Sequence, residues 1–283
     1  MSYVGLSKVI KEELSIANDI QIKGNEILNI VKEKISDKVI KSEIVETGVT
    51  VKNIKFNKNL FGVNTYFTVE YYNFKDKDIY KQLKKKIEHN TGYSSSVKGF
   101  AMVMLKCYGI SGQLQSKPLS NVLYHEIEHC YQFIKGCKQI SMPLDLYDKT
   151  RLYANSKNKY LTYTAAIIYH SYDFEQDGLI KGLYGYLKEV GQIGLLWDVV
   201  KGSEAYKVLQ KVKKGKELIS NCDMRERENI EKCFNINIDR LIKISDDVYK
   251  RLEKKIGKVL IKYRQDCLNE NKSLYRLGFS IIL

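Results

Sequence analysis

The segment YHEIEHCYQF (124–133) holds two of the chain's four histidines, four residues apart, with a glutamate directly after the first. On a helix, residues four apart lie on one face with Cβ atoms about 5–6 Å apart, so His125 and His129 can bind one zinc ion through bonds of about 2.0–2.1 Å. Glu126 lies about 100° further round the helix, where its carboxylate reaches a metal-activated water without binding the metal. The spacing therefore predicts hydrolysis of a polarised carbonyl, with Glu126 as general base.

A catalytic zinc site also needs a third protein ligand, because three ligands leave one coordination position open. The candidates lie in the segment IIYHSYDFEQDGLIKGLYGYL (167–187). We predict that Glu175 is the ligand. Gly178 and Gly182 follow it by three and seven residues on the same helical face, and residues without side chains let another helix approach closely.

His170 is the alternative ligand in this segment. It is also a candidate for stabilising the transition state, and Tyr169 and Tyr172 are candidates for the same role. The residues alone leave these alternatives open.

The elements that must position these side chains follow from hydrophobic periodicity. Apolar residues at helical spacing predict two short helices within 6–40, interrupted near Gly24. The segments 43–74 and 97–110 are rich in β-branched and aromatic residues and predict strands of a small sheet. A basic helical stretch is expected between them, at about 76–89. The near-continuous apolar character of 97–110 predicts burial on both faces.

A helix that carries the two histidines is predicted directly after the last strand. Ser120 is its predicted N-cap and Gly136 follows its last apolar turn, so the helix is expected over 120–135. From about Lys149 the chain is predicted to be mostly helical. The helices expected there cover 149–157, 161–170, 173–190, 203–219 and about 237–270. The last of them carries a steady apolar stripe at three- and four-residue steps.

A strand followed by an HExxH helix resembles the zincin metallopeptidases, in which an edge strand borders the substrate cleft and the next helix carries the motif. The resemblance implies an α+β, zincin-like fold over about 43–190, with a small mixed sheet, the motif helix and a mostly helical C-terminal half. A glutamate ligand such as Glu175 on a second helix is similar to the gluzincin branch. Gln132 and Lys135 replace the glycine and third histidine of the long zincin motif, and Leu179 replaces a gluzincin aspartate. No named peptidase family is therefore matched.

We predict three regions from these patterns. Residues 1–42 form N-terminal helices that pack on the core, 43–200 form the zincin-like metallopeptidase domain, and 201–283 form a basic helical C-terminal region. No stretch approaches about 18 uncharged apolar residues, so no transmembrane segment is expected. The opening MSYVGLSKVIKEEL lacks the apolar run of a secretory signal, which predicts a cytoplasmic location.

The functional prediction is a zinc metallopeptidase, a hydrolase that cleaves peptide bonds in a protein or peptide substrate. The alternative is a non-catalytic zincin-fold structural or binding protein. The formal net charge of +14 would attract nucleic acid or an acidic partner in a weak, salt-sensitive way. The bias towards Lys, Asn, Ile and Tyr fits an AT-rich coding genome, and a phage particle is therefore the alternative location.

Overall fold

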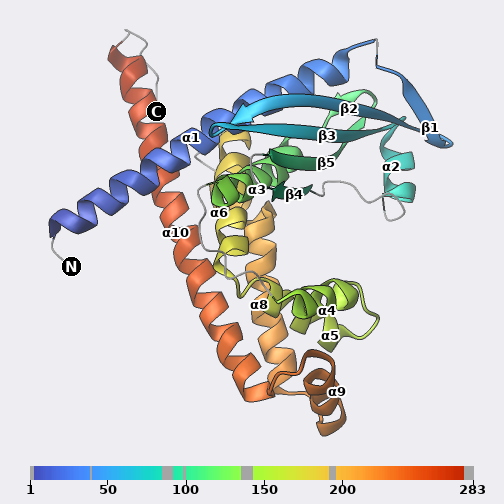
Figure 1. Cartoon of the computed structure of the whole chain (residues 1–283), viewed down its shortest axis with the longest axis vertical. Helices are drawn as coiled ribbons and strands as arrows, with labels where there is room; N and C mark the ends of the chain where they lie inside the picture. Colours follow the sequence, from blue (N-terminus) through green and yellow to red (C-terminus); the bar gives the residue numbers. More distant parts are fainter. Residues whose placement is uncertain are drawn as a thin grey trace. The chain divides into compact units, whose positions relative to one another are not determined.

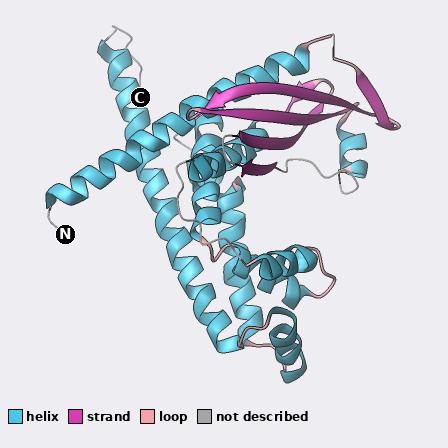
Figure 2. Ribbon diagram, viewed as in Figure 1, coloured by secondary structure: helices cyan, strands magenta, loops and turns pink. Residues whose placement is uncertain are grey.

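The computed structural model describes residues 3–38, 40–84, 92–97, 100–134, 143–190 and 196–276. The chain is organised in two compact units, Met1–Lys138 and Gln139–Leu283. The described strands all belong to the first unit, and the second unit is helical (Figure 1, Figure 2). This confirms the mixed α+β composition predicted from the sequence. The division into regions 1–42, 43–200 and 201–283 remains a prediction.

The elements of the first unit are α1 (Tyr3–Ser36), β1 (Ser42–Glu46), β2 (Val49–Leu60), β3 (Val63–Phe74), α2 (Lys77–Leu83), β4 (Gly92–Val97), β5 (Phe100–Ile110), β6 (Gln113–Leu114) and α3 (Ser116–Ile134). Those of the second unit are α4 (Leu144–Ala154), α5 (Lys159–Tyr169), α6 (Asp173–Val190), α7 (Leu196–Gly202), α8 (Glu204–Ser220), α9 (Met224–Phe234) and α10 (Ile238–Arg276).

The first unit is built on one mixed sheet with the strand order β1-β2-β3-β5-β4, and β6 pairs with the end of β5. β3 and β5 run parallel, whereas the other described pairs are antiparallel. The β2–β3 hairpin turns at Phe61 and Gly62, which both have positive φ, as a tight two-residue hairpin turn requires. β4 stands at one end of the strand order. No strand was predicted there, because its sequence GYSSSV lacks apolar alternation.

Two helices cover one face of this sheet, and a third covers part of the other. The residues buried under α1 and α3 include Phe67 of β3 and Val103 of β5. α2 packs on the opposite face, in a cluster with Phe74 and Tyr108. The prediction that the last strand is buried on both faces is wrong for its first half, where Met104 is 38% exposed. The reason is that α2 is short and covers this face only near the end of β5.

α1 is one continuous helix, so the predicted interruption near Gly24 is wrong. Glycine at this position serves close packing, because a Cβ atom on Gly24 would lie 2.8 Å from the ring of Tyr124. The Tyr124 hydroxyl donates a hydrogen bond to Asn25 Oδ1 at 2.5 Å, and its oxygen also lies 3.3 Å from the Gln21 carbonyl oxygen. These contacts hold α1 against α3 one residue before His125.

We expect Gly24→Ala to lower the free energy of unfolding. The added methyl group overpacks a buried ring, at a cost of about 1–3 kcal/mol, which exceeds the gain of about 1 kcal/mol in helix propensity. Gly257 of α10 is the matched control, because a Cβ atom there meets nothing within 4 Å. Gly257→Ala should therefore stabilise the protein by up to about 1 kcal/mol. Urea unfolding measures both changes, and a stabilising Gly24→Ala would contradict the packing argument.

α3 begins four residues earlier than predicted, so Ser120 lies inside the helix and is not its N-cap. Pro118 falls in the first turn, where the missing N–H costs no intrahelical hydrogen bond. The helix extends to Ile134, and Gly136 lies outside the described residues. The basic stretch 76–89 is described as helix only over α2 and lies partly outside the described residues.

In the second unit, α5, α6, α8 and α10 enclose a common core. α6 begins and ends at the predicted residues, 173 and 190. The apolar stripe predicted for the last helix is buried along α10, at Leu241, Val248, Leu252, Ile256, Val259 and Tyr263. α7 and α9 were not predicted. None of the described helices is long and apolar enough to cross a membrane.

Candidate metal centre

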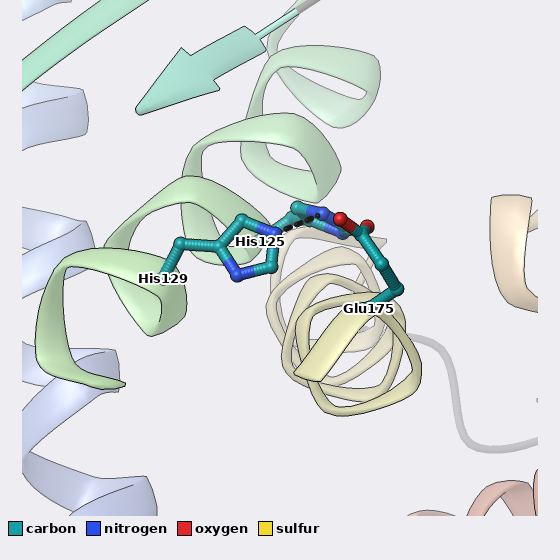
Figure 3. A group of neighbouring side chains, drawn as sticks. All are labelled: His125, His129 and Glu175. Carbon is teal, nitrogen blue, oxygen red and sulfur yellow. Dashed lines mark hydrogen bonds between the residues drawn. The ribbon is translucent and has the colours of Figure 1, made fainter. Parts of the chain in front are cut away.

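The two histidines of the motif face each other on α3 (Figure 3). The Nε2 atoms of His125 and His129 are 2.9 Å apart, and the ring planes are nearly perpendicular at 86°. His129 is buried, and His125 is half-buried. Two ring nitrogens at this distance cannot both carry a hydrogen or both present a bare lone pair, because either arrangement is repulsive. Either one ring donates its N–H to the lone pair of the other, or a metal ion lies between the two nitrogens.

This spacing fits zinc ligation. Two nitrogen donors on one tetrahedral zinc ion, each about 2.0–2.1 Å from the metal, lie about 3.3 Å apart. The distance between the two histidine nitrogens is close to that value, and both side chains lie on one face of α3. Two-histidine chelation by α3 therefore requires only a small adjustment of the side chains.

Glu126 is the second feature of α3 that fits a metal-dependent hydrolase. Its side chain is buried, with 6% of the residue exposed. Among the described residues, its Oε2 atom has no hydrogen-bond partner. A buried carboxylate oxygen without a partner is costly, and such atoms occur at sites that bind a ligand or perform chemistry. Glu126 thus offers a buried acceptor without a partner, one residue after His125.

Glu175 lies in the first turn of α6 and is buried, with 4% of the residue exposed. The ligand atoms of His125, His129 and Glu175 all lie within 4.8 Å of one another (Figure 3). Among the described residues, this is the group of His, Cys, Asp and Glu side chains that could hold a metal ion. Two imidazoles and a carboxylate are also the donor set that zinc accepts in hydrolases. The three side chains are therefore compatible with one metal site.

The alternative residues lie at the junction of α5 and α6. Tyr169 ends α5, His170 is its C-cap, and Tyr172 lies just before α6. The His170 carbonyl accepts a hydrogen bond of 2.8 Å from Gln176, which ties this junction to α6. His170 is not in the group that could hold a metal. Burial, followed by the charge of Asp145, raises the pKa of the Tyr172 hydroxyl, so it remains a hydrogen-bond donor at neutral pH.

Two further polar residues of α3 contact the histidine pair or each other. His129 Nδ1 lies 3.1 Å from Gln132 Oε1, and Gln132 Nε2 donates to Glu128 Oε1 at 3.3 Å. All three side chains are buried. Sequence reasoning noted Gln132 only as a departure from the long zincin motif. The signal that would have found it is its spacing, three residues after His129 and four after Glu128.

Cys130 is on the same helix but belongs to the hydrophobic core. Burial, and then the charge of Glu126, raises the pKa of the Cys130 thiol to about 12. A neutral thiol is a poor metal ligand, since the thiolate is the form that binds. Cys130 therefore packs rather than ligates.

No family model, no curated protein and no solved structure matches the chain. What the structure defines is a mixed α+β protein whose motif helix carries a histidine pair suited to metal binding.

Proposed function

We propose that this chain is a zinc-dependent metallopeptidase of the zincin type. The observation that carries the proposal is the pair of Nε2 atoms held 2.9 Å apart on α3, with the buried carboxylate of Glu126 one residue from His125. A mixed sheet that precedes the motif helix supports the same class, because it is the arrangement that the zincin resemblance implies.

His125, His129 and Glu175 would hold the zinc ion. When bound, zinc polarises a substrate carbonyl and lowers the pKa of a coordinated water towards neutrality. Glu126 accepts the proton of the attacking water at its unpartnered Oε2 atom. The same carboxyl group then returns that proton to the leaving amine, so that peptide hydrolysis needs no further acid or base.

The substrate would be an extended peptide bound along β4. This strand stands at one end of the strand order, antiparallel to β5, and α3 packs beside it. An edge strand presents backbone N–H and C=O groups that can pair with an extended chain. A peptide held in this way would pass close to α3.

Cleavage of a mixed peptide library, scanned by mass spectrometry, tests the proposed activity. We expect cleavage by zinc-loaded protein and none after treatment with a chelator. Zinc binding without any cleavage would instead favour the non-catalytic alternative, in which the basic chain binds nucleic acid or an acidic partner. Salt-sensitive nucleic-acid binding by the same protein would support that alternative directly.

Glu175→Ala is expected to weaken zinc binding substantially, because it removes a charged ligand and leaves two imidazoles. Asp177→Ala is the matched control on the same helix. Asp177 is partly exposed and pairs with Lys255 at 2.8 Å, so its loss should leave zinc affinity unchanged. Competition with a chromogenic chelator measures both affinities. If His170→Ala releases zinc and Glu175→Ala does not, His170 is the ligand.

A further inference from the structure

The buried residues Glu128, Gln132 and His129 form a hydrogen-bonded relay along one face of α3. We infer that Gln132 and Glu128 are positioning residues that fix the proton of His129 on Nδ1 and so turn the lone pair of Nε2 towards the metal. The inference rests on the proposed zinc site, because the lone pair of His129 Nε2 has to face the metal ion in order to bind it.

The direction of the relay follows from what each group can donate. The Gln132 group that faces Glu128 is the NH₂, since Nε2 donates to the carboxylate oxygen Oε1 at 3.3 Å. The other end of the amide, its carbonyl oxygen, therefore faces His129 Nδ1 at 3.1 Å. A carbonyl only accepts, so Nδ1 carries the hydrogen. In a neutral imidazole, Nε2 then presents its lone pair.

The same reasoning assigns the histidine pair in the metal-free protein. When His129 is neutral, its Nε2 can only accept, so Nε2 of His125 carries the proton in their 2.9 Å contact. The two rings thus present Nε2 in opposite protonation states. A metal ion that binds both nitrogens replaces this proton, and only the His125 ring has to change. His129 therefore already has the tautomer that binds a metal in the metal-free protein, whereas His125 does not.

Nitrogen-15 NMR of the imidazole rings in metal-free protein tests the assignment without zinc or catalysis. We expect Nδ1 to be protonated and Nε2 bare in His129, and Nε2 to be protonated in His125. Gln132→Met keeps the length of the side chain but removes the acceptor, so the Nδ1-protonated form of His129 should no longer predominate. Glu128→Gln should also mix the two forms, because a glutamine no longer dictates which way the Gln132 amide points.

Zinc affinity is the second readout. Losing a partner behind a metal-binding histidine typically weakens metal binding by about 10- to 100-fold, and we expect this range for Gln132→Met. The exchanged variant Glu128→Gln/Gln132→Glu is the decisive control. Its glutamate accepts from His129 Nδ1 and its glutamine donates to that glutamate, with the net charge unchanged. It should recover the tautomer of His129 and most of the lost affinity.

Wild-type tautomer and affinity in Gln132→Met would overturn the inference, as would an exchanged variant no better than Gln132→Met. Equal thermal stability of the variants confirms that any loss is local. Wild-type protein with the expected ring protonation that binds no zinc would overturn the proposed metallopeptidase and still support the relay. The two hypotheses therefore fail separately.

Discussion

Glu126→Gln is expected to lower peptide hydrolysis by about 10²- to 10⁴-fold while zinc content stays close to that of the wild type. The amide nearly matches the carboxylate in size, so it fits the same buried position on α3. It cannot take a proton from the attacking water, because an amide is not a base at neutral pH. The substitution therefore removes the general base and leaves the zinc ligands unchanged.

The measurement compares initial rates on one cleaved peptide with zinc content determined on the same preparation. Glu217→Gln is a matched control, since Glu217 is an exposed residue of α8 and its substitution should leave the rate unchanged. If wild type and Glu126→Gln both bind zinc and cleave every library peptide equally, Glu126 is not the base. The metallopeptidase proposal would then lose its main chemical support.

His129→Ala is expected to abolish stoichiometric zinc binding. Wild-type protein purified without added metal should carry about one zinc ion per chain, which a chelator removes. The variant loses a buried donor and leaves His125 without the partner that holds its Nε2 atom in place. Without the second imidazole, α3 supplies one nitrogen in place of a chelating pair.

Thermal unfolding gives this prediction an independent readout. A ligand that binds only the folded state adds about 4.1 kcal/mol of stability at a concentration 1,000-fold above its dissociation constant. The melting temperature of wild-type protein should therefore rise with zinc and fall with a chelator, whereas His129→Ala should respond to neither. His89→Ala is the control, since His89 lies outside the motif and should keep the response. A metal-free wild type that does not respond to zinc would end the ligand hypothesis.

The sequence by itself determined the features that depend on local geometry. The four-residue spacing of His125 and His129 places both rings on one face of any helix, whatever surrounds it. Hydrophobic periodicity likewise predicted α6 to the residue and the buried stripe of α10. The Gln132 relay is local as well, and the i+3 and i+4 spacings would have revealed it.

Only the tertiary structure decided the features that depend on packing between distant segments. Gly24 does not interrupt α1, because its missing side chain lets the helix pack closely against the ring of Tyr124, 100 residues later. β4 joins the sheet although its serine-rich sequence has little strand preference, because the unpaired edge of β5 supplies its hydrogen bonds. Which carboxylate lies near the histidines is equally non-local, since no periodicity within α6 distinguishes Glu175 from its acidic neighbours. Glu175 and the two histidines are far apart in the sequence, so their proximity depends on tertiary structure.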